Sequence, residues 1–298
     1  MMKLSSSEFE VLTCIEREKR ELTQREIEKL TKLSLGSVNR IVSKFIENKL
    51  ISAGNLITND GLEVLEQYRV KRAIFLAAGF GSRLVPITLN TPKPMVLVNG
   101  KRIIETLLDA VVKAEIEEII IVTGYLNYQF DVLTKKYPNI KFVYNERYNE
   151  ANNILSAYLV RDKLSHAYVL ESDLYLYNSN LIRKYEYHSN FLGIKVDRTD
   201  DWCFETKKGV IVKEKQGGED CYQMAGISYY DEDSASKMSK DIEDVFNSPG
   251  GKEKYWEQVM LDEKKNNYKI YVRESNKGDI IEIDTFNELK AIDKAYDV

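Results

Sequence analysis

The sequence is short of the residues that build disulfide frameworks and zinc sites. It has three cysteines, Cys14, Cys203 and Cys221, which are widely spaced and form no Cys-x-x-Cys pair. An odd count without such pairs argues against a disulfide framework, so we interpret them as reduced, small apolar residues. His166 and His188 are the only histidines, and we interpret both as ordinary surface or hydrogen-bonded residues. Two histidines are too few for a convincing zinc site or Ser-His-Asp triad.

Long apolar runs are also missing. The longest lies near residues 119–122, far short of the roughly 20 residues that cross a membrane. The first residues contain no apolar signal core, so we expect a cytoplasmic protein without membrane contact. What the chain does have is 298 residues, 43% of them hydrophobic and 30% charged, with no low-complexity segment. That is enough apolar material for a sizeable core and enough length for two domains.

Residues 73–95 carry the strongest functional signal. They read AIFLAAGFGSRLVPITLNTPKPM, an apolar strand that runs into a glycine-bearing loop. Gly79 and Gly81 let backbone N–H groups approach an anion, Arg83 offers a bidentate charge, and Lys93 adds a point charge between two prolines. This pattern predicts a phosphate site. A dinucleotide fingerprint would need glycine where Leu84 stands, and no Gly-Lys-Ser/Thr closes the loop as in a Walker A motif.

Residues 1–70 are predicted to form a small helical domain. Apolar residues line one face of each of three helices, and Thr23 with Glu26 forms a capping box before the second. Residues 50–58 alternate and turn at Gly-Asn, as a short hairpin does, and a last helix covers 62–70. Three helices and a hairpin are typical of a winged helix-turn-helix, and the segment resembles the winged-helix domains of bacterial regulators.

The charge of this domain leaves its partner open. Its 11 Lys and Arg are balanced by 11 Asp and Glu, so few cations beyond Arg40, Lys44 and Lys49 remain for DNA phosphates. DNA binding is one interpretation. A winged helix used for dimerisation or docking is the other.

Residues 71–298 show alternating strand and helix patterns. The strand patterns are 72–77, 118–122, 141–144 and 168–174, and the helix patterns are 103–114, 128–137 and a third that begins at 152. This order predicts a mostly parallel sheet with helices on both faces and ligands at the carboxyl ends of its strands. Short alternating runs at 191–196, 202–206, 210–212 and 224–229 predict a smaller mixed-sheet lid that carries an acceptor pocket. Two helices, 234–247 and 253–264, and a strand, 280–284, complete the prediction.

Paired carboxylates end two of these strands. Glu171 and Asp173 are separated by one residue, as are Glu282 and Asp284. In an extended chain such pairs point to one side, where their oxygens suit a hard cation.

The loop and several later motifs resemble those of the nucleotidyltransferases. Over nearly their whole length, residues 71–298 are similar to the bacterial CTP:phosphocholine cytidylyltransferases. The matching pieces are Gly79 to Leu84, Thr91-Pro92-Lys93, Asn152-Asn153, Glu171-Ser172-Asp173, Asp201-Trp202, Tyr255-Trp256-Glu257 and Glu282-Ile283-Asp284. The resemblance implies an α/β, Rossmann-like domain with a mixed, mostly parallel sheet. It also implies Mg²⁺-dependent transfer of CMP from CTP to phosphocholine, with release of pyrophosphate.

The resemblance assigns roles to individual residues. Lys93, Arg83 and Asp173 would be catalytic, and Asp173 and Asp284 would bind Mg²⁺, with Glu171 beside them. No protein general base is needed, because a phosphomonoester is largely dianionic at neutral pH. The implied nucleotide-binding residues are Leu76, Ala77, Ala78, Gly79, Gly81, Ser82, Arg83, Lys93, Asn152, Asn153 and Ser156. The implied acceptor-binding residues are Asp201, Trp202, Glu214, Lys215, Gly226, Tyr255, Trp256 and Glu257.

Some of these assignments have alternatives. The amides of Asn152 and Asn153 suit a pyrimidine edge, but they also suit the start of a helix. Trp202 and Trp256 could form an aromatic cage for a trimethylammonium group, or could pack inside the lid. The acceptor could instead be 2-aminoethylphosphonate, phosphoethanolamine or a sugar phosphate. A DNA-binding regulator that only senses a nucleotide is a further alternative, and a homodimer is left open.

Overall fold

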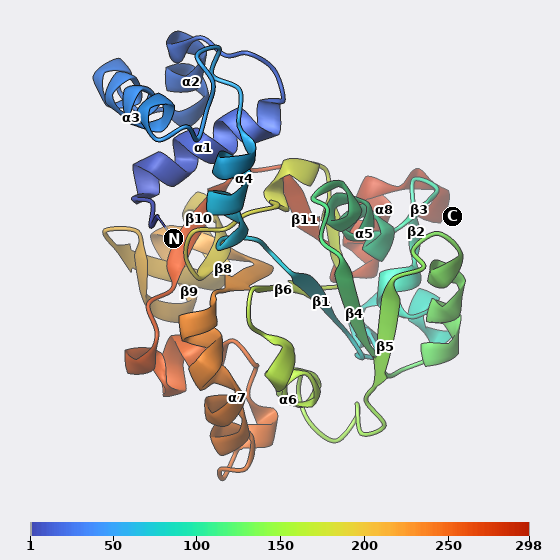
Figure 1. The fold of residues 1–298 in the computed structure, drawn as a ribbon. Helices are drawn as coiled ribbons and strands as arrows, with labels where there is room; N and C mark the ends of the chain where they lie inside the picture. The colour runs from blue at the N-terminus through green and yellow to red at the C-terminus, as the bar shows by residue number, and fades with distance from the viewer. Residues whose placement is uncertain (1, 298) are drawn as a thin grey trace. The chain divides into compact units, whose positions relative to one another are not determined.

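The computed structural model describes residues 2–297, which divide into two compact units (Figure 1). The N-terminal unit is the chain up to Arg69 together with Tyr185–Tyr187. The C-terminal unit is Val70–Lys184 and the chain from His188 onward.

The N-terminal unit is helical. Its helices are α1 (Ser6–Glu18), α2 (Gln24–Thr31), α3 (Leu35–Glu47) and α4 (Asn59–Glu66). The predicted capping box is confirmed, because the Thr23 hydroxyl accepts from the Glu26 N–H while the Glu26 carboxylate accepts from the Thr23 N–H. The predicted hairpin is reduced to a single bridge between Ile51 and Ile57, and α4 begins earlier than predicted because Thr58 caps it. That these elements form a winged helix-turn-helix stays a prediction.

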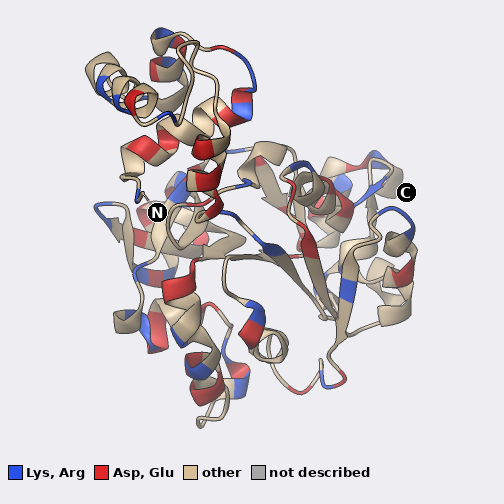
Figure 2. Ribbon diagram, in the orientation of Figure 1, with Lys and Arg blue, Asp and Glu red and all other residues tan. Residues whose placement is uncertain are grey.

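Tyr185–Tyr187 belong to this unit although they lie far along the chain. The Phe9, Tyr68 and Tyr187 rings pack together, with centroids 5.1 to 5.4 Å apart. The Tyr187 hydroxyl donates to the Leu4 carbonyl over 2.7 Å. Charged residues of both signs lie on α1, α2 and α3, whereas α4 carries Asp and Glu alone (Figure 2).

The C-terminal unit is built on a seven-stranded sheet in the order β10-β8-β9-β6-β1-β4-β5. Strands β6, β1, β4 and β5 run parallel, as do β10 and β8, whereas β9 is antiparallel to its neighbours. The prediction of a mixed, mostly parallel sheet is therefore confirmed. The strands of this sheet are β1 (Arg72–Ala77), β4 (Glu118–Thr123), β5 (Ile140–Tyr144), β6 (Ala167–Glu171), β8 (Asn190–Lys207), β9 (Val210–Tyr230) and β10 (Tyr271–Ser275).

Helices cover both faces of the sheet, because alternate residues of its apolar strands point to opposite sides. Ala73 and Phe75 of β1 pack in one core with α5 (Ile103–Lys113). Ile74 and Leu76 pack in a second core with α6 (Ile154–Leu159) and α7 (Glu232–Phe246) (Figure 1). A last helix is α8 (Phe286–Ile292). None of the helices in the described chain is long and apolar enough to cross a membrane.

The predicted separate lid is wrong. Its short runs belong to β8 and β9, which are 18 and 21 residues long and extend the central sheet. Polar segments such as 197–201 and 216–219 interrupt the apolar alternation along these strands, so one long strand has the pattern of two short ones.

Two predicted helices also take other forms. The segment Asn127–Lys135 is a 3₁₀ helix, in which Phe130 and Leu133 bury one above the other at a spacing of three. The segment predicted as a helix over 253–264 is divided into the turn Gly251–Glu253 and the π-helical turn Val259–Glu263. Between these turns, the backbone N–H of Tyr255 donates to the Gln258 side chain and that of Trp256 donates to the Asn153 side chain.

Two small antiparallel pairs lie outside the central sheet. One joins β2 (Leu97–Val98) to β3 (Lys101–Arg102), and the other joins β7 (Leu174–Leu176) to β11 (Ile280–Glu282). The strands of the second pair are about a hundred residues apart in the sequence. Asp173 directly precedes β7 and Asp284 closely follows β11, so the pair brings the two predicted metal ligands to the same place.

Candidate functional site

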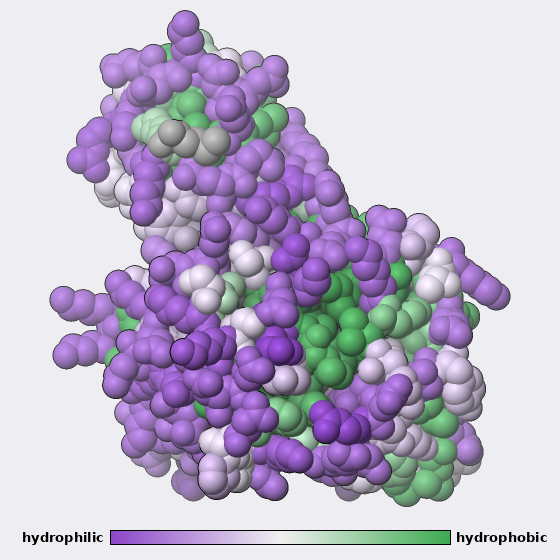
Figure 3. Space-filling model, turned by 60° about the horizontal axis from the view of Figure 1, so that its bottom comes forward, coloured by the Kyte–Doolittle hydropathy of each residue, from purple (hydrophilic) through white to green (hydrophobic). Residues whose placement is uncertain are grey.

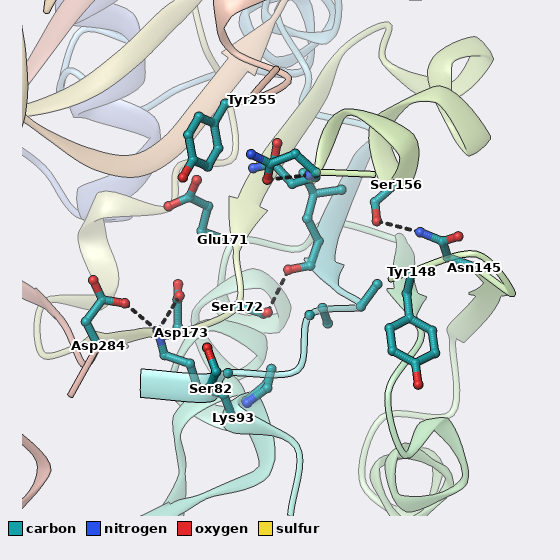
Figure 4. A pocket seen from close by; sticks show the side chains of 18 of the residues that line it. Ser82, Lys93, Asn145, Tyr148, Ser156, Glu171, Ser172, Asp173, Tyr255 and Asp284 are labelled. Carbon is teal, nitrogen blue, oxygen red and sulfur yellow. Dashed lines mark hydrogen bonds and ion pairs between the residues drawn. The ribbon is translucent and has the colours of Figure 1, made fainter. Parts of the chain in front are cut away.

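A cavity of about 420 Å³ opens at the carboxyl ends of β1 and β6. Leu76, Ala77 and Ala78 line it. So do the charged residues Lys93, Asp173 and Asp284 (Figure 4). On the face of the C-terminal unit seen in Figure 3, hydrophobic residues gather in a hollowed area that hydrophilic residues surround. Ligand binding at strand carboxyl ends is the general rule for open α/β sheets.

Glycines allow close packing in and around the loop from Gly79 to Leu84, called the signature loop below. Gly81 has φ +68°, and a Cβ there would lie 2.9 Å from Lys93 Cβ. The Thr88 hydroxyl donates to the Gly81 carbonyl over 2.9 Å and holds the loop against the following segment. At Gly124 a Cβ would lie 2.6 Å from the Ala78 carbonyl oxygen, so this glycine also lets two loops meet at the sheet edge.

Lys93 lies at the centre of the charged part of the cavity. Its ammonium donates to Asp173 Oδ2 over 2.7 Å and to Asp284 Oδ1 over 2.6 Å (Figure 4). Burial alone would lower the pKa of Lys93, but the two carboxylates outweigh burial and raise it above its usual value. Arg83 contacts Asp284 Oδ1 over 2.8 Å from a side chain that is 67% exposed.

The two predicted metal ligands come together through the β7–β11 pair. The Ile283 N–H donates to the Asp173 carbonyl over 3.2 Å, which places Asp284 beside Asp173. Glu171, Asp173 and Glu282 each offer a carboxylate oxygen, and these oxygens lie within 4.8 Å of one another.

These residues fit a divalent cation. Burial, followed by Asp173 and Glu171, raises the pKa of Glu282 to about 9. Burial, followed by Glu257 and Asp173, also raises the pKa of Glu171 well above its usual value. Asp173 Oδ1 accepts no hydrogen bond from any described residue. Crowded carboxylates with a buried unpaired oxygen form a donor set that suits Mg²⁺.

All the residues predicted to bind nucleotide line this one cavity, and so do Asp173, Asp284 and Tyr255. The cavity also contains residues absent from the predicted nucleotide and metal sets. These are Pro94, Asn145, Tyr148, Ala151, Glu171, Ser172 and Glu282. For Glu171 and Glu282 the signal was present in the sequence, since each lies two residues before a predicted metal ligand on an alternating strand.

Asn152 and Asn153 use their amides within the protein. Asn153 Oδ1 accepts from the Trp256 N–H over 2.8 Å, and Asn152 Nδ2 donates to the Glu253 carbonyl over 3.2 Å. In this structure the two amides therefore hold the segment 253–256 against the start of α6.

The two predicted cage tryptophans lie in different surroundings. Trp256 is 2% exposed and packs in the core, with its ring centroid 5.7 Å from that of Tyr230. Trp202 packs edge-on against Tyr255 at 6.1 Å, and Tyr255 lines the cavity. The aromatic pair beside the cavity is therefore Trp202 with Tyr255, whereas Trp256 packs in the core.

The other predicted acceptor residues lie outside the cavity lining. Lys215 pairs with Glu205 over 2.5 Å, and the Asp201 carboxylate accepts from the Trp202 N–H over 2.7 Å. Gly226, at φ +55°, leaves the space that Glu171 fills, since a Cβ there would lie 2.6 Å from Glu171 Oε2.

Burial raises the pKa of Glu214 to about 7 and that of Glu257 to about 8. One oxygen of each, Glu214 Oε1 and Glu257 Oε2, has no hydrogen-bond partner among the described residues.

Comparisons with known proteins agree with this geometry. A model of the nucleotidyl transferase family matches residues 72–216. The chain is 34% identical over 232 residues to a 2-aminoethylphosphonate cytidylyltransferase of Lancefieldella rimae, covering 75% of this chain and 92% of that protein. It is 33% identical over 228 residues to a choline-phosphate cytidylyltransferase of Streptococcus pneumoniae, covering 75% and 97%. A solved CTP:phosphocholine cytidylyltransferase from Streptococcus pneumoniae matches with a TM-score of 0.70 and 32% identity, over 76% of this chain and 99% of that one.

Proposed function

Since the chain belongs to the nucleotidyl transferase family, we propose that it transfers CMP from CTP to a small phosphorylated or phosphonylated amine and releases pyrophosphate. The observation that carries this proposal is the single cavity in which the glycine loop, Lys93 and two separate acidic strand ends meet. A protein that only sensed a nucleotide would not need this complete set of charged groups.

The reaction is attack by an acceptor oxygen on the α-phosphorus of CTP, with pyrophosphate as the leaving group. The loop N–H groups and Arg83 hold the β- and γ-phosphates, and Lys93 neutralises charge that develops at the α-phosphate. Because the attacking oxygen is already anionic, the protein contributes position and charge rather than a general base.

Asp173 and Asp284 would hold Mg²⁺, with Glu171 and Glu282 close by. When bound, this ion would supply a positive charge that offsets the negative charge of the nucleotide phosphates.

Phosphocholine is the proposed acceptor. Its trimethylammonium group cannot donate an N–H hydrogen bond and is best held by aromatic faces with a nearby carboxylate. Tyr255 and Trp202 supply the rings, and Glu171 of the same cavity supplies the carboxylate. Two choline-phosphate cytidylyltransferases among the relatives support this assignment.

A second candidate acceptor is 2-aminoethylphosphonate, the substrate in the name of the relative from Lancefieldella rimae. That relative is as similar to this chain as the choline-phosphate cytidylyltransferase from Streptococcus pneumoniae, and the primary ammonium of its substrate would donate three hydrogen bonds where a trimethylammonium donates none.

Steady-state kinetics with phosphocholine, phosphoethanolamine and 2-aminoethylphosphonate test the acceptor. If phosphocholine is the substrate, it has the highest kcat/KM. Trp202→Leu then raises its KM by about tenfold, which corresponds to the roughly 1 to 2 kcal/mol that a cation gains over an indole ring. Higher kcat/KM for a primary amine, kept in Trp202→Leu, would assign the acceptor to the second candidate instead.

For the N-terminal unit we propose docking to a protein or to a second copy rather than DNA binding. Its charge is balanced, and Lys44 of α3 is already paired with Glu8 over 2.5 Å. Fluorescence anisotropy with random duplexes at low salt tests this. Affinity that falls steeply with salt would favour DNA binding.

A further inference from the structure

The ammonium of Lys93 occupies the acidic site in this structure. It lies 2.7 Å from Asp173 Oδ2 and 2.6 Å from Asp284 Oδ1, the carboxylates to which Mg²⁺ is assigned above. Its side chain is 9% exposed, so water screens these ion pairs weakly. A divalent cation on Asp173 would therefore lie next to an unscreened positive charge or would have to displace it.

We propose that Lys93 is the resident counter-cation of the acidic site, which binds a divalent cation tightly only after nucleotide phosphates have drawn Lys93 away. This coupling rests on the proposed function, because it takes the nucleotide to bind in the same cavity. Lys93 exchanges two carboxylates for a phosphate group, and Asp173 and Asp284 are then free for the metal. By linkage, the metal must raise nucleotide affinity by the same factor by which the nucleotide raises metal affinity.

The two cations of the site differ in a way that makes the inference specific. Lys93 pairs with both aspartates from a buried position, whereas Arg83 pairs with Asp284 alone and is 67% exposed. Removing the buried charge should therefore strengthen metal binding far more than removing the exposed charge.

Titration of the full chain with Mn²⁺, followed by electron paramagnetic resonance without nucleotide, tests the first half of the proposal. Lys93→Met should bind Mn²⁺ about tenfold or more tightly than the wild type, and Arg83→Met about threefold or less. Lys141→Met is the matched control, because Lys141 is a 69% exposed cation at the start of β5 that pairs with Glu118. Lys93→Arg, which keeps the charge, should keep the weak binding. Equal Mn²⁺ affinity in the wild type and in Lys93→Met would overturn the proposal. If Lys93→Met does not fold, Lys93→Gln replaces it in the same titration.

Repeating the titration with an α,β-methylene analogue of CTP tests the coupling. In the wild type the analogue should raise Mn²⁺ affinity, after correction for the complex of Mn²⁺ with free analogue. In Lys93→Met this factor should fall by about tenfold. An unchanged factor overturns the coupling. If the analogue does not bind at all, the proposed function fails, while the titration without nucleotide still decides whether Lys93 opposes metal binding.

Discussion

Replacing Gly81 with alanine tests whether the signature loop positions Lys93. Gly81 has φ +68°, a conformation that costs an L-residue about 1–2 kcal/mol. The new Cβ would also lie 2.9 Å from Lys93 Cβ and 3.2 Å from Thr88 Cγ2, so Lys93 has to move. A reactive group displaced by about 1 Å can cost on the order of a hundredfold in rate. We therefore expect kcat to fall by about ten- to a hundredfold and Tm to fall by about 2–8 °C.

Two other glycines separate these effects. At Gly79 no described atom lies within 4 Å of an added Cβ and φ is not positive, so Gly79→Ala should leave Tm nearly unchanged. At Gly100 φ is +79°, again with no described atom within 4 Å, so Gly100→Ala should show the loss of stability without the loss of kcat. Thermal unfolding and steady-state kinetics measure both quantities. If Gly81→Ala lost no more activity than Gly100→Ala, the loop would not position Lys93.

The charged groups give three further predictions. Asp173→Asn and Asp284→Asn should each lower kcat by orders of magnitude with the circular dichroism spectrum unchanged, and near-normal activity in both would remove them from the reaction. Lys93→Met should lower kcat far more than it raises the KM for CTP, because its charge acts on the transition state; a pure KM effect would assign it to ground-state binding. Burial, aided by Asp262, raises the pKa of Glu214 to about 7, so the folded state holds this proton more tightly than the unfolded state. The free energy of unfolding should therefore fall between pH 4.5 and about 7, and Glu214→Gln should flatten that part of the profile. Denaturant titrations at several pH values measure it, and identical profiles would contradict the shift.

That the glycine loop and Lys93 line one cavity could be predicted because the signal is local. The strand, the two glycines, Arg83 and the proline-flanked Lys93 lie within 25 residues, and each residue type has one main use in such a loop. That Asp173 and Asp284 meet at Lys93 depends on the pairing of β7 with β11. These strands have three residues each, too few for a periodic pattern that would indicate their pairing.

The acceptor side was harder to predict because its residues face inward or outward according to tertiary contacts. Nothing in the run Tyr255-Trp256-Glu257 tells which ring is buried, and the hydrogen bond from the Trp256 N–H to Asn153 contributes to that choice. The assignment of Tyr185–Tyr187 to the N-terminal unit has the same origin, since three residues carry no sign of the core they join.

Pyrophosphate release by the full chain is the measurement that tests the central claim most directly. The chain would be incubated with Mg²⁺, with CTP, ATP, GTP or UTP in turn, and with phosphocholine or 2-aminoethylphosphonate, and the products would be identified by ³¹P NMR. The account predicts pyrophosphate and a CMP-linked product with CTP and at least one of these acceptors. Absence of any nucleotide-linked product, or a clear preference for another nucleotide, would contradict it.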